Sequence, residues 1–187
     1  VPFVKQALTA SWWIYLPVVF GFVVLVGNAV NLTDGLDGLA IVPSAFAVST
    51  LGLFAWIMGN AIWSKYLFFP LLPGVGELVV VCAAFVGAAV GFLWFNAYPA
   101  QVFMGDAGSL AIGGFLATVS VLVKQEALFL ILGGLFIVEA VTSQVQDKIG
   151  IKWLGRRLFY RAPLHHQLQH TGLAETKVVI RLWIVSL

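Results

Sequence analysis

Long apolar stretches alternate with short polar segments along this chain. The five longest cover residues 12–30, 39–58, 78–95, 109–123 and 127–144. A helix that crosses a bilayer needs about 20 apolar residues; the fourth stretch is short, but the Lys124 side chain can reach the interface from its end. A sixth stretch begins near Val178 and is cut off at Leu187. The pattern predicts an all-α, polytopic helical membrane protein with five full spans and a truncated sixth.

Composition supports lipid as the solvent for most of the chain. Hydrophobic residues make up 61% of it and charged residues only 10%, whereas soluble domains carry about 25% charged residues. One globule of 187 residues could not hide so many apolar side chains. A very apolar soluble domain is therefore disfavoured, and residues 1–187 are interpreted as a single transmembrane domain.

Three polar loops are predicted on one side of the membrane, at about residues 31–37, 96–108 and 148–177. Two spans separate each loop from the next, and an even number of crossings returns the chain to the same side. Seven of the ten lysine and arginine residues lie between Lys148 and Arg181, and basic loops mark the cytoplasmic face. A nucleic-acid patch is the weaker interpretation, so no nucleic-acid partner is expected.

The first of these loops follows a span directly and concentrates amides and carboxylates. Asn28, Asn31 and Asp34 recur at a spacing of three and could share one face of a helix end. Asp37 follows closely, and Gly35 lets the backbone approach a ligand. Carboxylate and amide oxygens suit Mg²⁺ or the polar groups of a substrate. A capped helix end is the structural alternative.

The second loop combines an acid, flanking glycines and an aromatic residue. Asp106 lies between Gly105 and Gly108, just before an apolar helix. Such a helix start favours phosphate, and a carboxylate there can hold Mg²⁺ that bridges to phosphate oxygens. Phe103 could stack on a base. An Asp N-cap with an interfacial Phe is the alternative.

The third loop holds all three histidines of the chain, His165, His166 and His170. They could contact phosphate or shuttle protons, or be incidental residues of a solvated loop. A zinc site is disfavoured because the single cysteine, Cys82, is remote. Glu139 lies within the fifth stretch and is either a functional acid or a buried, paired structural one. Together the loops indicate a Mg²⁺-assisted phosphate reaction at the membrane surface.

Three runs resemble the bacterial phospho-N-acetylmuramoyl-pentapeptide transferases (translocase I), a branch of the polyprenyl-phosphate sugar-1-phosphate transferase superfamily. They are NAVNLTDGLDGLA, NAYPAQVFMGDAGSLAIGG and APLHH. The first two are shared more loosely by the superfamily, and the third is more specific to the branch. The resemblance implies transfer of phospho-MurNAc-pentapeptide from UDP to undecaprenyl phosphate, giving lipid I and UMP with Mg²⁺ as cofactor. It also implies a ten-span fold in the bacterial inner (cytoplasmic) membrane, with the active site facing the cytoplasm.

The resemblance assigns roles by motif position. The implied catalytic residues are Asp34, Asp37, Asp106, His165 and His166. The implied substrate-binding residues are Asn28, Asn31, Gly35, Leu36, Phe103 and Gln146. Asp106 is also the implied metal ligand, and Phe103 is implied to stack on uracil.

The chain departs from the family pattern in two ways. Gln167 stands where the family has its third histidine, and glutamine cannot carry a proton charge at neutral pH. An earlier aspartate pair of the family has no counterpart, because the chain starts too late to include it. The chain is therefore expected to be the C-terminal half of the ten-span fold and inactive alone.

Two alternative functions stay open from the sequence. A related polyprenyl-phosphate HexNAc-1-phosphate transferase is disfavoured by the APLHH run. An ion-coupled transporter would place its carboxylates near the bilayer midplane in broken helices, whereas most acids here lie at span ends. The expected partners are UDP-MurNAc-pentapeptide, undecaprenyl phosphate and the lipid bilayer; a homodimer is left open.

Overall fold

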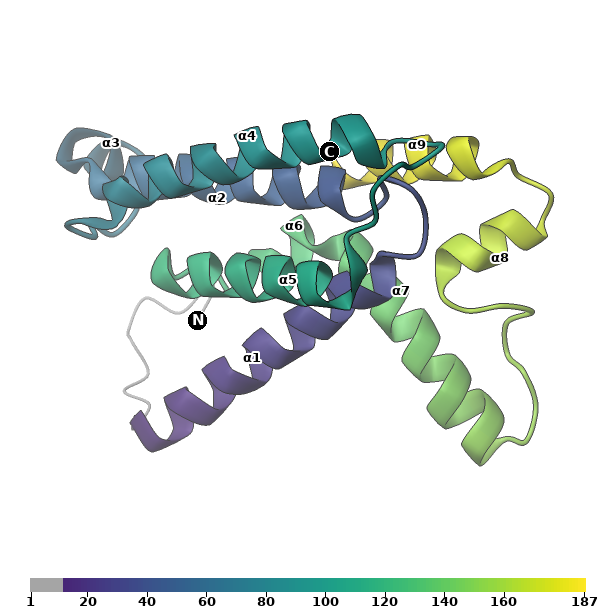
Figure 1. Ribbon diagram of the computed structural model, residues 1–187. Coiled ribbons are helices and arrows are strands. Elements are labelled where there is room, and N and C mark those ends of the chain that lie inside the picture. The colour runs from purple at the N-terminus through teal and green to yellow at the C-terminus, as the bar shows by residue number, and fades with distance from the viewer. Residues whose placement is uncertain (1–11) are drawn as a thin grey trace.

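A computed structural model describes residues 12–187, and the regular elements within them are all helices (Figure 1). Four segments are long and apolar enough to span a membrane. They are α1 (Trp12–Thr33), α2 (Ile41–Gly59), η1 with α4 (Val75–Glu77, Leu78–Asn96) and α5 (Gly105–Leu122). The shorter helices are α3 (Ala61–Tyr66), α6 (Phe129–Leu132), α7 (Gly134–Gln144), η2 (Val145–Trp153), α8 (Leu164–His170) and α9 (Glu175–Ser186). The predicted all-α membrane class is confirmed.

The fifth predicted span is an interrupted helix. α6 ends at Leu132, α7 begins at Gly134, and the chain then continues as the π-helix η2. A Cβ atom on Gly133 would lie 2.5 Å from Cε1 of Phe129, so a residue with a side chain does not fit at the break. The helical path also runs nine residues beyond Gln144, into a segment that the sequence predicted to begin a basic loop. The span count of the full-length protein stays a prediction.

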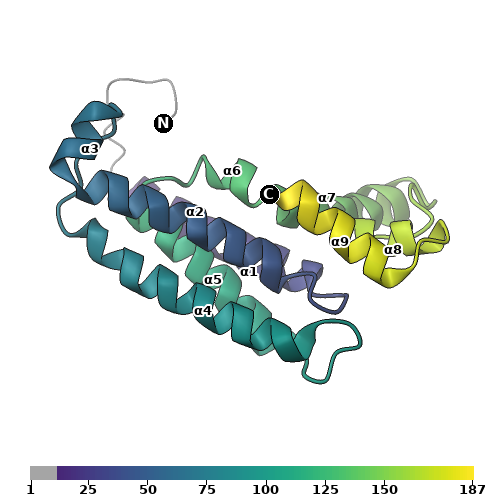
Figure 2. The same ribbon diagram turned by 90° about the horizontal axis from the view of Figure 1, so that it is seen from above.

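The helices form two neighbouring pairs. α1 packs against α5 at an angle and α2 packs along α4, while α7 crosses the end of α1 (Figures 1 and 2). Buried side chains such as Val30, Leu51 and Leu116 join these helices in one apolar core. A second cluster, which includes Leu39 and Leu182, packs α9 against the segment between α1 and α2. These contacts bring the loops after α1 and before α5 to the same end of the molecule.

α1 and α5 come close together where two glycines meet. A Cβ atom on Gly113 would lie 2.6 Å from the Cα atom of Gly27 and 2.9 Å from the carbonyl oxygen of Val26. Small residues at such crossings let the backbones of membrane helices come close together. This contact sets the spacing between the helix ends that carry Asn31 and Asp106.

Gly113→Ala is expected to lower the free energy of unfolding by about 1–3 kcal/mol, because the added methyl group forces two backbones apart. Gly114→Ala is the matched control, since a Cβ atom there meets nothing within 4 Å. Thermal unfolding of the full-length protein in detergent compares the two variants. Equal melting temperatures would contradict the close packing of α1 on α5.

Candidate active site

The loop after α1 and the loop before α5 line one pocket of about 210 Å³. Its lining residues are Asp34, Gly35, Leu36, Asp37, Asn96, Phe103, Met104, Gly105 and Asp106. Six of these are residues that the sequence predicted for the site. The structure therefore brings together the two loops that span parity placed on one side.

Two residues with carboxylate side chains, Asp34 and Asp106, line this pocket. Asp34 directly follows α1, and Asp106 lies in the first turn of α5. Burial raises the pKa of Asp34 above its usual value, and the nearby Asp106 carboxylate raises it further. The two acids therefore repel one another, and a cation between them would relieve that repulsion.

Asn31 links α1 to α5 beside these acids. Its Nδ2 atom donates to Oδ1 of Asp106 at 3.1 Å and to Oγ of Ser109 at 2.9 Å. Because α1 packs against α5, an amide in the last turn of one helix reaches the first turn of the other. Asn31 thus fixes one oxygen of the Asp106 carboxylate, and Ser109, which the sequence had not suggested, completes the link.

Asp37 is held by segments far away in the sequence. Its Oδ2 atom accepts a hydrogen bond from the Ala100 backbone N–H at 2.9 Å. Its own backbone N–H donates to Oε1 of Glu175 at 3.5 Å. The carboxylate therefore joins the two loops of the pocket, and α9 supports the loop from behind.

The backbone of Gly38 is fixed on both of its polar groups. Its N–H donates to Oδ1 of Asn96 at 3.1 Å, and its carbonyl accepts from Nε1 of Trp183 at 3.2 Å. Its φ of +75° is a conformation that favours glycine. A Cβ atom would also meet the side chains of Leu93 and Trp183 at 3.2 and 3.3 Å. Asn96 and Trp183 are thus supporting residues that the sequence had not indicated.

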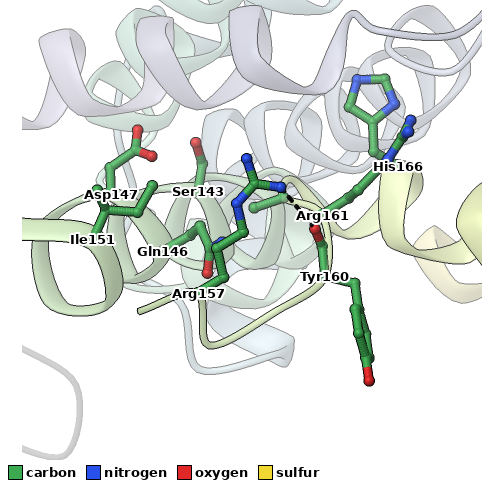
Figure 3. A pocket seen from close by; sticks show the side chains of 9 residues that line it. Ser143, Gln146, Asp147, Ile151, Arg157, Tyr160, Arg161 and His166 are labelled. Atoms are coloured by element: carbon green, nitrogen blue, oxygen red, sulfur yellow. Dashed lines mark hydrogen bonds between the residues drawn. The ribbon is translucent and has the colours of Figure 1, made fainter. Parts of the chain in front are cut away.

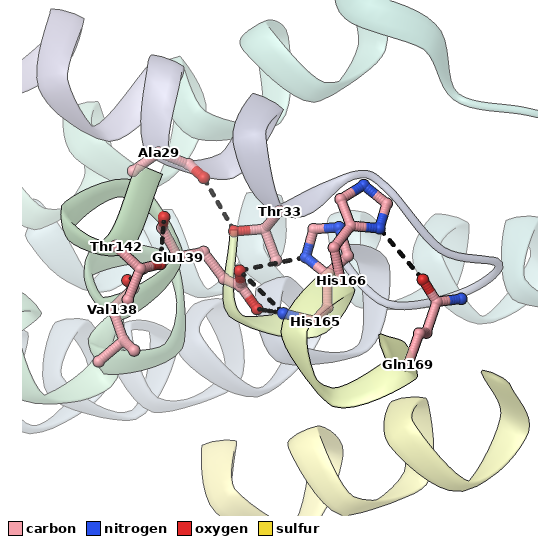
Figure 4. Close-up of polar contacts among 8 residues, drawn as sticks. All are labelled: Ala29, Thr33, Val138, Glu139, Thr142, His165, His166 and Gln169. Carbon is pink, nitrogen blue, oxygen red and sulfur yellow. Dashed lines mark hydrogen bonds and ion pairs between the residues drawn. The ribbon is translucent and has the colours of Figure 1, made fainter. Parts of the chain in front are cut away.

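α8 brings His165 against the backbone of Gly35. The His165 side chain is buried, and a Cβ atom on Gly35 would overlap its Nε2 atom and lie 3.0 Å from its Cε1 atom. On its other side, His165 contacts the buried carboxylate of Glu139, with 3.1 Å between Nδ1 and Oε2 (Figure 4). Glu139 is therefore a buried, paired acid, as one of its two interpretations had it.

Two predicted substrate-binding residues use their amides within the protein. Asn28 is exposed and donates to the Val24 carbonyl of its own helix at 2.8 Å. Gln146 is buried, and its Oε1 atom accepts from the backbone N–H groups of Leu158 and Phe159, both at 3.0 Å. Neither residue lines the acidic pocket. Through these hydrogen bonds, Gln146 instead holds the loop after η2 against η2 itself.

His166 lines a second pocket, of about 450 Å³ (Figure 3). The other lining residues come mainly from η2 and the loop before α8: Ser143, Gln146, Asp147, Ile151, Arg157, Tyr160, Arg161 and Ala162. The two adjacent histidines therefore face different surroundings, and His166 is not brought to the carboxylates. Gln167, in the place of the family's third histidine, accepts a hydrogen bond from the Arg161 N–H at 2.9 Å. Its role here is to hold that loop.

Residues 1–124 match the family model described as glycosyl transferase family 4. The chain belongs to this family. It is also 52% identical, over 191 aligned positions that cover all of it, to a phospho-N-acetylmuramoyl-pentapeptide-transferase of Desulfovibrio desulfuricans. The chain spans about half the length of that relative, 52%. The resemblance seen in the three runs is confirmed, and the full-chain identity extends it past residue 124 to α7 and α8.

The donors of the acidic pocket fit the Mg²⁺ that the resemblance to the muramoyl-pentapeptide transferases implies. Mg²⁺ is commonly bound by one or two protein carboxylates, with water and substrate phosphates as its other ligands. Asp34 and Asp106 supply two carboxylates that line one pocket of about 210 Å³. Within residues 12–187, no three His, Cys, Asp or Glu side chains converge as a closed metal site would require.

Asp34→Asn is expected to stabilise the Mg²⁺-free protein at neutral pH. The pKa of Asp34 is higher in the folded state than in the unfolded state, so ionisation of this acid opposes folding. The penalty is absent below the unfolded pKa, grows between the unfolded and the folded pKa, and stays constant above the folded pKa. In EDTA, the melting temperature of Asp34→Asn should therefore exceed that of the wild type at pH values above the folded pKa of Asp34. At low pH the two melting temperatures should become equal. The control Asp147→Asn, an exposed acid, should show no such pH-dependent gain.

Proposed function

We propose that the full-length protein transfers phospho-MurNAc-pentapeptide from UDP to undecaprenyl phosphate, giving lipid I and UMP. The observation that carries this proposal is the 52% identity to a phospho-N-acetylmuramoyl-pentapeptide-transferase along the whole chain. The aligned region covers the APLHH run, which lies beyond the family match at residues 1–124. The same alignment supports an inner-membrane location with the acidic pocket facing the cytoplasm, as does the basic segment from Lys148 to Arg181.

The residues of the pocket would have separate roles in this reaction. Asp106 and Asp34 would hold Mg²⁺, and Asn31 keeps the Asp106 carboxylate in place. When bound, Mg²⁺ supplies positive charge to the pyrophosphate oxygens. Phe103 is 73% exposed at the pocket and offers an aromatic face to uracil. Asp37 would shape the pocket through its bond to Ala100 and remains a catalytic candidate.

The chain spans 52% of the length of its relative, and we propose that the remaining part of the full-length protein helps to bind the other reactant, the lipid phosphate. The aspartate pair implied by the resemblance would lie in the remaining part of the full-length protein. The tests of function therefore use that protein in detergent or in lipid nanodiscs.

Product analysis tests the proposal directly. The purified full-length protein is given undecaprenyl phosphate and either UDP-MurNAc-pentapeptide or UDP-GlcNAc, with and without Mg²⁺. We expect UMP and lipid I from the first donor only, and only with Mg²⁺. Transfer from UDP-GlcNAc alone would support the HexNAc-1-phosphate alternative. Transport of a substrate without Mg²⁺, retained in Asp106→Asn, would support the transporter.

A further inference from the structure

We propose that Glu139 is a positioning residue that fixes the tautomer and the orientation of His165, so that the imidazole Nε2 atom is held ready to pair with the substrate beside Asp34. The inference rests on the proposed function and adds a role within the same site. It joins a buried acid in α7 to a histidine 26 residues later in α8.

Glu139 holds His165 at two points. Its Oε1 and Oε2 atoms accept from the His165 backbone N–H at 3.2 and 3.4 Å, and Oε2 lies 3.1 Å from the ring Nδ1 (Figure 4). His165 is the second residue of α8, where backbone N–H groups lack partners within the helix. Pro163, which precedes α8, provides no side-chain cap. One carboxylate therefore caps the helix and orients the ring.

Two hydroxyl groups beside this pair, those of Thr33 and Thr142, already donate to backbone carbonyl groups (Figure 4). Thr33 donates to the Ala29 carbonyl at 2.9 Å, and Thr142 donates to the carbonyls of Val138 and Glu139 at 2.8 and 2.9 Å (Figure 4). These bonds stay within their own helices. The carboxylate of Glu139, whose side chain is fully buried, is thus directed at His165.

The acid determines which ring nitrogen carries the proton. An ionised carboxylate only accepts hydrogen bonds, so the Nδ1 atom of His165 must donate. In a neutral imidazole the proton then sits on Nδ1, and Nε2 is left with a free lone pair. An acid that orients a histidine in this way is a recurrent arrangement where the opposite nitrogen acts on a substrate.

The Nε2 atom of His165 is buried and has no hydrogen-bond partner among the described residues. Buried polar atoms are nearly always paired, so an unpaired one calls for an explanation, and next to a site a catalytic role is one such explanation. The residue covering it is Gly35, which has no side chain and lines the acidic pocket. The backbone of this exposed glycine, adjacent to Asp34, thus lies between Nε2 and the pocket. A small shift of this loop on substrate binding would allow Nε2 to pair.

The test combines the state of the ring with catalysis in the full-length protein. Nitrogen NMR of histidine-labelled protein at pH 8 reports the tautomer of His165, whose signals are assigned from their loss in His165→Asn. We expect the Nδ1–H tautomer in the wild type and in Glu139→Gln, because the glutamine oxygen still accepts from Nδ1. In Glu139→Leu we expect this preference to disappear. We also expect kcat to fall by about 100-fold, within the range for acid–base groups, with a small change in the KM for UDP-MurNAc-pentapeptide.

Partial rescue separates positioning from folding alone. Glu139→Gln should keep kcat within about tenfold of the wild type, a smaller loss than removal of a full acid–base contribution causes. The control Glu126→Leu, on the loop after α5, should have the kcat of the wild type. The Nε2–H tautomer in wild-type protein would overturn the inference, as would a Glu139→Leu variant that is less stable but unchanged in kcat. If the wild type does not use UDP-MurNAc-pentapeptide, the proposed function fails, while the tautomer measurement still decides on Glu139.

Discussion

Asp106→Asn in the full-length protein is expected to lower turnover at least about 100-fold and to raise the Mg²⁺ concentration needed for half-maximal rate. The reason is loss of charge with little change of shape. The asparagine oxygen can still accept from Nδ2 of Asn31, so the link between α1 and α5 should survive. One of the two carboxylates that would hold the metal is lost, and contributions of this kind to phosphoryl transfer are worth several kcal/mol.

Initial rates measured across a Mg²⁺ series check this prediction. Glu126→Gln is the matched control, because it removes an acid beyond the opposite end of α5. Unfolding in EDTA provides a second readout: with Asp106 neutral, one cause of the raised pKa of Asp34 disappears, so the melting temperature should not fall. A wild-type rate in Asp106→Asn would remove this residue from the metal site.

Gly35→Ala is expected to cost both activity and stability. The new methyl group would overlap the His165 ring, which Glu139 prevents from moving away. Such overpacking typically costs about 1–3 kcal/mol, and displacement of the adjacent Asp34 by about 1 Å could lower the rate about 100-fold. Gly21→Ala, in α1, should be harmless because a Cβ atom there meets nothing within 4 Å.

A double-mutant cycle tests whether contact with the His165 ring causes the loss of stability expected in Gly35→Ala. His165→Ala opens the space that the methyl group added by Gly35→Ala needs, so the two substitutions together should destabilise the protein less than the sum of their separate effects. The free energy of unfolding in detergent is the measured quantity. Strict additivity would show that the His165 ring is not what excludes a side chain at position 35.

The membrane class could be predicted from sequence because each membrane-spanning helix corresponds to one continuous run of apolar residues. The sidedness of Asp34 and Asp106 followed from counting those runs, and the structure does place both acids in one pocket. The extent of the fifth helix could not be predicted this way. Lys148 and Lys152 suggested a loop, yet the backbone there continues as a π-helix.

The supporting residues of the site were beyond sequence reasoning because their contacts are long-range. Glu175 and Trp183 reach the Asp37–Gly38 backbone from α9, and no local pattern signals this. The prediction for Gln146 shows the opposite difficulty. A polar residue on a helix suggests a substrate-binding role, but here the Gln146 side chain accepts hydrogen bonds from backbone N–H groups of the loop after η2.

The break between α6 and α7 has a consequence for sequence variation. Phe129, one helical turn before Gly133, fills the volume that a side chain at position 133 would need, and it is almost completely buried. The two positions should therefore covary: a relative with a larger residue at the break is expected to have a smaller one in place of the phenylalanine. Because α7 carries Glu139, such paired changes would preserve the direction of the helix, whereas a change at one position alone would be selected against.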